Sequence, residues 1–265
     1  MGSMPALAVL HPGAMGAAVA ACLVERGHEV GWLRIGRSDA TVRRAAEAGL
    51  TPFDDLAELL AHADMVFSIC PPHGALDVAR GLAGFEGIVV DANAVSPETA
   101  MLISDTVTAG GAGYVDGGII GPPPLTAGTT RLYLAGDDGE VANLFAGSAL
   151  DAVNLTGAAP AASALKMTYA AWTKTTAALL VSIRDTAAAY GVDADLATEW
   201  AMSQPHLADA WLRAREQTQE KGWRWAYELA EVGRTFAAVG QPEGFGAAAS
   251  EVFTSNDDLP GTGGH

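Results

Sequence analysis

Apolar and polar residues follow two different patterns along the chain, and the change comes near residue 160. Before this point, short apolar runs alternate with segments of helical period, as in chains that alternate strands and helices. The segments 16–27 and 41–49 predict helices that end at glycines. Strands this apolar predict a parallel sheet covered by helices on both faces. The apolar runs place these strands at residues 6–10, 29–33, 64–70, 87–92, 113–117 and 132–136.

After residue 160 the pattern is helical throughout. The stretch from Pro160 to Tyr190 has no residue that breaks a helix after the proline, and proline is well placed at a helix start. This stretch is apolar on nearly every side, so we expect protein to surround it. Further helices are predicted from His206 onward, with interruptions at Gly222 and at Gly240. The sequence therefore predicts an α/β first half and an all-helical second half.

The amino-acid composition restricts which partners the protein can bind and says little about its fold. The net charge is -16, which argues against binding to nucleic acid or to an anionic membrane. Cys22 and Cys70 lie in apolar segments and are expected to be buried free thiols. With no apparent signal peptide or membrane-length apolar run, they favour a cytoplasmic location. No Cys/His cluster has the spacing of metal ligands, so we expect no metal site.

The segment HPGAMG, residues 11–16, follows a predicted strand and precedes a predicted helix. This is the context of the glycine-rich turn that binds a dinucleotide, in which Gly13 lets the backbone approach a pyrophosphate and Gly16 lets the helix pack on the sheet. The first glycine position holds His11, which is either a polar contact to cofactor or substrate or a tolerated, partly exposed histidine. The predicted cofactor contacts here are His11, Pro12, Gly13, Ala14 and Met15.

The residues after the second predicted strand bear on which cofactor is bound. Enzymes that use NAD usually offer an acid there to the ribose hydroxyls. This chain instead has Arg34, Arg37 and Ser38, with no acid before Asp39. Two cations and a hydroxyl suit a 2′-phosphate, so the sequence predicts NADP(H) in preference to NAD(H). The alternative is a solvated basic loop.

Six motifs in one order resemble those of the β-hydroxyacid dehydrogenase superfamily, which includes 6-phosphogluconate and 3-hydroxyisobutyrate dehydrogenases and the imine reductases. The resemblance implies a Rossmann domain at residues 5–157 with a parallel sheet. It also implies a long interdomain helix and an all-α substrate and dimerisation domain at residues 158–255, through which a homodimer forms. Residues 256–265 are polar and glycine-rich and are expected to be a disordered tail. The motifs are HPGAMG, GRS, SICPP, DANAVSPET, YVDGGIIGPPPLTAGTTRLYLAG and ALKMTYAAWTK.

The resemblance also implies where the site residues lie. Cys70, Pro71 and Pro72 follow the cofactor near the nicotinamide ribose, and Asn93 meets both nicotinamide and substrate. Lys166 takes the place of the family's catalytic lysine. The substrate-facing turn is expected at Gly117, Gly118, Ile119, Ile120 and Gly121.

Two departures from the hydroxyacid dehydrogenases change the expected substrate. Their Ser-Gly-Gly clamp for a carboxylate is replaced by Ile120-Gly121-Pro122, and the asparagine that follows their lysine is replaced by Tyr169. The segment DGGIIGPPP is more similar to the corresponding segment of imine reductases, which recognise apolar substrates. Those enzymes typically lack the lysine, so this chain combines features of both groups.

The expected chemistry centres on Lys166. The positive end of the helix dipole and its apolar neighbours should lower the pKa of this lysine. Tyr169 lies three residues further on the same helix face and could hydrogen-bond a carbonyl oxygen or an imine nitrogen. The alternative for Lys166 is a lysine whose stem packs on the core while its ammonium reaches solvent.

The sequence thus predicts an NADPH-dependent oxidoreductase that reduces a small, fairly apolar C=O or C=N substrate. Lys166 would act as the general acid with support from Tyr169. Two alternatives remain open: a β-hydroxyacid dehydrogenase with a carboxylate substrate, and a non-catalytic NADP(H)-binding sensor protein.

Overall fold

The computed structural model describes residues 4–254, except for the side chains of residues 220, 221 and 223. The tail predicted at residues 256–265 lies outside the described residues. The chain divides into two compact units, Met1–Lys166 and Met167–His265, and the division falls inside helix α7 (Ala161–Ala170). The first unit contains strands and helices and the described part of the second contains helices alone, which confirms the predicted fold class.

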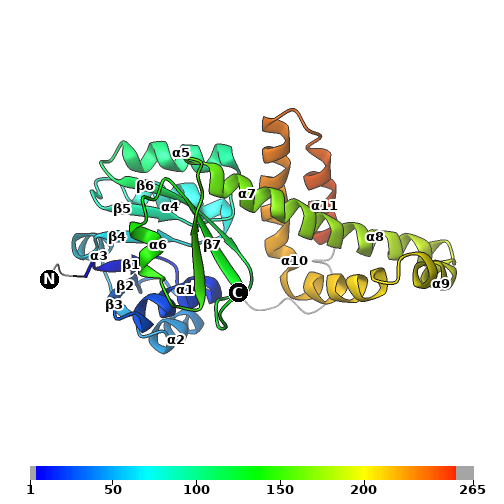
Figure 1. Ribbon diagram of the computed structural model, residues 1–265, viewed down its shortest axis with the longest axis horizontal. Helices are drawn as coiled ribbons and strands as arrows, with labels where there is room; N and C mark the ends of the chain where they lie inside the picture. The colour runs from blue at the N-terminus through cyan, green and yellow to red at the C-terminus, as the bar shows by residue number, and fades with distance from the viewer. Residues whose placement is uncertain (1–3, 255–265) are drawn as a thin grey trace. The chain divides into compact units, whose positions relative to one another are not determined.

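The described residues of the first unit form an eight-stranded sheet in the order β3-β2-β1-β4-β5-β6-β7-β8 (Figure 1). Neighbouring strands are parallel except β6 and β7, so the sheet is mainly rather than wholly parallel. The strand order reverses between β1 and β4, and in such sheets ligands bind where the order reverses, outside the carboxyl ends of the strands. The strands are β1 (Leu7–Val9), β2 (Val30–Leu33), β3 (Thr51–Phe53), β4 (Met65–Ser68), β5 (Ile88–Asp91), β6 (Gly113–Ile120), β7 (Thr130–Ala135) and β8 (Leu150–Asn154).

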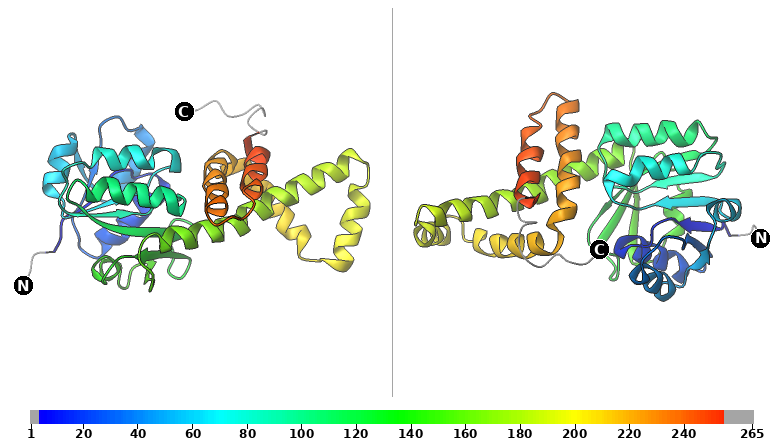
Figure 2. Two further views of the ribbon diagram at one scale, coloured as in Figure 1. Left: turned by 90° about the horizontal axis from the view of Figure 1, so that it is seen from above. Right: turned by 180° about the vertical axis from the view of Figure 1, so that it is seen from behind.

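Helices cover both faces of this sheet, as Figure 2 shows. Successive side chains of β1 point to opposite faces, because a strand has a period of two. Leu7 and Val9 accordingly join one core cluster, and Ala8 and Leu10 join another. The helices are α1 (Ala14–Glu25), α2 (Asp39–Glu47), α3 (Leu56–His62), α4 (Ala75–Gly81), α5 (Pro97–Thr108) and α6 (Glu140–Leu144), with a short 3-10 turn at Pro72–Gly74.

The long helix predicted after Pro160 is present with one irregularity. Between α7 and α8 (Thr176–Ala189), residues Ala171–Thr175 form a π-helical turn. Within this turn, the Lys174 side chain is buried and pairs with Glu228, with 2.6 Å between Nζ and Oε2. None of the described helices is both long and apolar enough to cross a membrane.

The predicted helix break at Gly222 is wrong. One helix, α10 (Leu207–Ala238), runs through it, between α9 (Asp193–Ser203) and α11 (Gly244–Thr254). A Cβ at Gly222 would lie 3.6 Å from Cδ1 of Phe253, so the glycine lies against α11. Glycine inside a helix costs about 1 kcal/mol relative to alanine, and packing of this kind can offset that cost.

Candidate active site

The turn between β1 and α1 has the geometry of a dinucleotide cradle. A Cβ at Gly16 would lie only 2.3 Å from the carbonyl oxygen of His11, so only glycine permits this close approach of helix and turn. A Cβ at Gly13 would meet nothing within 4 Å, so the space beside the turn is open. Helix α1 has no acidic residue in its first turn, and no side chain caps it. Its N–H groups and positive dipole end therefore suit the phosphates of a dinucleotide.

His11 presents an unsatisfied atom at this cradle. Its Nδ1 is buried and has no hydrogen-bond partner among the described residues. Burial, and secondarily the charge of Arg37, lower the pKa of His11 to about 4. The imidazole is therefore neutral at neutral pH. A buried polar atom without a partner is uncommon in folded proteins, and a ligand that donates a hydrogen bond would satisfy it.

The residues predicted to hold a 2′-phosphate have different surroundings. Arg37 is half-buried, and its guanidinium donates to the carbonyl oxygens of Leu10 and Leu33, at 3.4 Å each, across the ends of β1 and β2. Arg34 forms a two-point ion pair with Asp54 after β3, at 2.8 and 2.5 Å. Arg37 thus lies at the sheet edge near the cradle, whereas Arg34 already has an anionic partner.

Ser38 serves first as a helix cap. Its Oγ accepts a hydrogen bond from the Thr41 N–H at 3.3 Å and so caps the N-terminus of α2. The hydroxyl also lies 3.2 Å from Oγ1 of Thr41. Contact between Ser38 and a phosphate stays a prediction.

Asn93 is buried and holds the ends of β4 and β5 together. Its Oδ1 accepts from the Cys70 N–H at 2.6 Å, and its Nδ2 donates to Oγ of Ser68 at 2.9 Å and to the Asp91 carboxylate. The asparagine therefore holds the start of the turn at Cys70, Pro71 and Pro72 in place through the Cys70 N–H. Both of its amide donors are used, so its side chain is committed to this support.

Cys70 lies near the cradle but is not an activated thiol. Burial, followed by the negative charge of Asp91, raises the pKa of its thiol to about 12. Arg37 acts on both Cys70 and His11 through its charge. The structure thus brings together His11, Arg37 and Cys70, which follow three different strands.

The predicted substrate-facing turn is mostly strand. Residues 117–120 belong to β6 because β7 pairs antiparallel with them, and only Gly121 leaves the strand, with a φ of +131°. Ile119 and Ile120 are buried, so their side chains contribute to the core. A Cβ at Gly118 would lie 2.7 Å from the Ala162 carbonyl oxygen and 3.1 Å from Cβ of Lys166. Gly118 therefore lets α7 lie directly on β6, and this contact fixes the position of the Lys166 Cβ.

The sequence reasoning missed a buried carboxylate under the start of α7. Asp116 is completely buried, and its Oδ2 accepts from the N–H groups of Ala162 at 2.8 Å and Ser163 at 3.0 Å. The Ser163 hydroxyl donates to Oδ1 at 2.5 Å. The available signal was an aspartate inside the apolar run GYVDGG, since a charged residue in a buried strand needs a partner.

A second buried carboxylate, Asp91, pairs in register with Asp116 across β5 and β6. Burial is the main reason that the pKa of Asp91 is raised to about 7. The Tyr114 hydroxyl donates to it at 3.3 Å. Burial also raises the pKa of Asp116, while the hydrogen bonds from Ser163 and Ala162 oppose this shift.

Tyr169 lies one turn beyond Lys166 on α7 and belongs to the second unit. Its side chain is 47% exposed. Lys166 is half-buried. The roles of both residues stay predictions. Within the described residues, no group of three or more His, Cys, Asp or Glu side chains could hold a metal ion.

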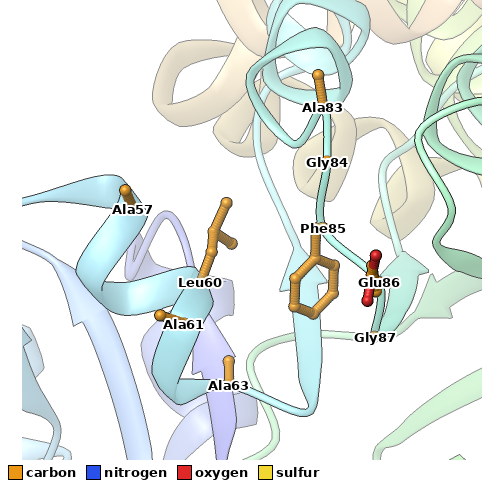
Figure 3. A pocket seen from close by; sticks show the side chains of 9 residues that line it. All are labelled: Ala57, Leu60, Ala61, Ala63, Ala83, Gly84, Phe85, Glu86 and Gly87. Atoms are coloured by element: carbon orange, nitrogen blue, oxygen red, sulfur yellow. The ribbon is translucent and has the colours of Figure 1, made fainter.

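A hollow of about 420 Å³ opens elsewhere on the first unit, between α3 and the loop before β5. Leu60 and Phe85 lie on its two sides, and Glu86 is the one charged residue among those that line it (Figure 3). Because Ala63 and Gly87 precede β4 and β5, it lies at the amino ends of the strands. It is therefore at the opposite edge of the sheet from the cradle.

Comparisons with known proteins agree with this geometry. The family described as the NAD binding domain of 6-phosphogluconate dehydrogenase matches residues 7–146, and a domain of unknown function (DUF1932) matches residues 187–255. A curated relative, an uncharacterized 28.5 kDa protein of Methanothermus fervidus, is 40% identical over 65 residues. That match spans 24% of this chain and only 26% of the relative.

Solved structures share the fold along nearly the whole chain. A conserved protein of unknown function, described as structurally similar to 3-hydroxyacid dehydrogenases, is 25% identical, with 95% of this chain and 96% of that chain covered and a TM-score of 0.71. The 3-hydroxyisobutyrate dehydrogenase of Mycobacterium tuberculosis is 20% identical (96% and 94% covered, TM-score 0.69). A reductive aminase of Aspergillus terreus is 16% identical (96% and 94% covered, TM-score 0.61). The last two likenesses show the fold alone.

Proposed function

The chain belongs to the family with the NAD binding domain of 6-phosphogluconate dehydrogenase, a family of NAD(P)-dependent oxidoreductases, and from this premise we propose that it is an NADPH-dependent reductase. Its substrate is a small, fairly apolar compound with a C=O or C=N bond. The observation that carries the proposal is the place of Lys166 against Gly118. Asp116 pairs with Asp91, the last residue of β5, and Gly118 lies two residues further along β6. The Cβ of Lys166, which packs on Gly118, is therefore at the edge of the sheet formed by the carboxyl ends of the parallel strands.

The cradle supports binding of a nicotinamide dinucleotide. The turn from His11 to Met15 and the first turn of α1 would hold the pyrophosphate. Nδ1 of His11 would accept a hydrogen bond from a ribose hydroxyl of the cofactor. When bound, the reduced nicotinamide supplies the hydride. Arg37, at the carboxyl ends of β1 and β2, favours a 2′-phosphate and hence NADPH, whereas Arg34 is already paired with Asp54.

Lys166 would supply the proton. Its ammonium Nζ would donate to the oxygen or nitrogen of the substrate's reducible bond as negative charge develops there. The hydroxyl of Tyr169 would hydrogen-bond the same atom. General acid catalysis of this kind typically contributes about 10²–10⁴-fold to the rate.

The replacement of a serine by Ile120, at the position where the hydroxyacid dehydrogenases bind a carboxylate, supports the proposal of an apolar substrate. Ile120 replaces the serine of the hydroxyacid dehydrogenases, and it is buried at 5% exposure. The clamp hydroxyl is therefore missing from this strand. A reductive aminase with this fold is described in complex with NADPH4, cyclohexanone and allyl amine. A carboxylate-specific dehydrogenase remains the second candidate, because Lys166 is retained.

The second unit supports the proposed homodimer. Leu179, Tyr190 and Val192 are 57%, 81% and 46% exposed, and they line a mainly apolar hollow of about 510 Å³ along α8 and α9. Exposed apolar surface of this extent commonly marks an interaction site. A second copy of the chain would cover it.

Steady-state NADPH oxidation by the wild type and by Lys166→Ala tests the proposal. The substrate panel holds cyclic imines, apolar ketones, ketoacids and aldehyde acids. We expect turnover of imines or apolar ketones, with a loss of at least about 10²-fold in the variant. Arg80→Ala is a control on an exposed surface ion pair and should keep wild-type rates.

Other outcomes point elsewhere. Turnover confined to carboxylates would select the hydroxyacid dehydrogenase. NADPH binding measured by fluorescence, without turnover of any class, would favour the sensor protein. Full activity of Lys166→Ala would remove the lysine from the mechanism.

A further inference from the structure

We propose that Asp116 is a positioning residue that fixes Lys166 through the first turn of α7, an inference that rests on the role proposed above for the lysine. Asp116 belongs to β6, and Lys166 belongs to α7. The hydrogen bond from the Ala162 N–H to Asp116 joins the two elements across 46 residues of sequence. The strand and the helix are joined by a set of hydrogen bonds and one close contact, all inside the first unit.

The hydrogen bonds satisfy the helix start from outside. The first N–H groups of a helix have no partner within it, and a side chain just before the helix usually caps them. Pro160 precedes α7 and has no side-chain acceptor. Instead, the Asp116 carboxylate accepts the N–H groups of Ala162 and Ser163 and also the Ser163 hydroxyl. Asp116 and Ser163 are 0% and 1% exposed, so water cannot replace these bonds.

The close contact lies one turn further along. Gly118 is two residues beyond Asp116 and packs against Ala162 and Lys166. Side chains two apart on a strand point to the same face and are about 6.6 Å apart. Asp116 therefore holds the first turn of α7 by hydrogen bonds, and Gly118 packs against the following turn, which contains Lys166. The place of Cβ of Lys166 is set by the strand.

The charge of Asp116 adds an electrostatic effect. All three neighbours donate to its oxygens, which is the pattern of a carboxylate rather than a carboxylic acid. An anion here offsets the positive end of the α7 dipole. Because it binds the helix one turn before Lys166, we expect it also to favour the charged form of this lysine. Among the described residues, Asp91 on β5 and Tyr114 on β6 are titratable groups on which the charge of Asp116 also acts.

The test uses the fact that the chain has three lysines, Lys166, Lys174 and Lys221. Lysine labelled with ¹³C at Cε gives three NMR signals, and Lys166→Arg identifies the one from Lys166. In Asp116→Asn we expect the titration midpoint of this signal to fall by about one pH unit, because a nearby anion is lost. We expect kcat to fall about tenfold with the KM for NADPH within about twofold, since the cradle is untouched.

A second pair of variants separates geometry from charge. Ser163→Ala keeps the carboxylate but removes one of its donors, so kcat should fall about threefold with an unchanged midpoint. Ser163→Thr restores the hydroxyl and should restore kcat. An unchanged midpoint in folded Asp116→Asn would overturn the inference. If Asp116→Asn does not fold, wild-type kcat in Ser163→Ala would overturn it instead.

The outcome is distinguishable from failure of the proposed function. If Lys166→Ala keeps full turnover, the catalytic role of the lysine has failed. The NMR titration then still decides whether Asp116 controls Lys166, because it does not depend on turnover.

Discussion

Replacing Gly118 by alanine should move the catalytic lysine while leaving the cofactor site intact. The added Cβ would lie 2.7 Å from the Ala162 carbonyl oxygen and 3.1 Å from Cβ of Lys166. The first of these contacts is with backbone, which cannot rotate away, so α7 must shift on β6. Overpacking of this kind costs about 1–3 kcal/mol. For a chain of this size, we expect the melting temperature to fall by roughly 2–10 °C.

The effect on catalysis should exceed the effect on stability. A shift of about 1 Å in a catalytic group can cost on the order of 10²-fold in rate. A displacement of about half that size therefore predicts a kcat roughly 10-fold below wild type. The dissociation constant for NADPH should stay within about twofold, because the cradle lies on β1 and α1 and not on β6.

The assay compares kcat, NADPH affinity and melting temperature of Gly118→Ala with those of Gly74→Ala. Gly74 belongs to the same unit, has a φ of -97° and would meet nothing within 4 Å, so its alanine variant should behave as wild type. Wild-type kcat in Gly118→Ala would refute the idea that β6 positions the lysine. A loss of NADPH affinity as large as the loss of kcat would mean that the damage is general.

Three further predictions concern single groups. In steady-state kinetics, Arg37→Ala should raise the KM for NADPH about tenfold and hardly change the KM for NADH. Arg34→Ala should raise the KM for NADPH less, because Asp54 already neutralises Arg34. Equal effects of Arg37→Ala on both cofactors would contradict a contact with the 2′-phosphate. Native Cys70 should react with iodoacetamide at pH 8 on the order of 10²–10³ times more slowly than in the unfolded chain, because its pKa is about 12; comparable rates in peptide mass spectrometry would disprove the burial argument. The folded-state pKa of Asp91 is raised to about 7, so its contribution to stability is complete below about pH 4 and is lost as pH rises through 7. Asp91→Asn should therefore narrow the difference in melting temperature between pH 5 and pH 8, and an unchanged difference would show that Asp91 does not titrate in this range.

The local patterns of this sequence determine most of its architecture. Alternation of apolar strands with helices predicts the α/β unit, and unbroken helical period after Pro160 predicts the helical unit. The spacing of Gly13 and Gly16 predicts the cradle, since a tight turn and a close helix approach each depend on neighbouring residues alone. The short edge strand β3 was missed because its three residues, with exposed Thr51 and Pro52, give no apolar run.

Only the tertiary structure decides which buried polar groups meet. Asp116 caps α7, Asn93 joins β4 to β5, and Arg34 faces Asp54, and each contact joins segments far apart in sequence. Strand order sets these neighbours, and local sequence does not encode that order. For the same reason Gly222 failed as a signal, because the packing of α10 against α11 outweighs the poor helix propensity of one glycine. The sequence determines the elements and the cradle, whereas the packing of β6 against α7 determines where Lys166 lies, because that position depends on contacts that exist only once the sheet has formed.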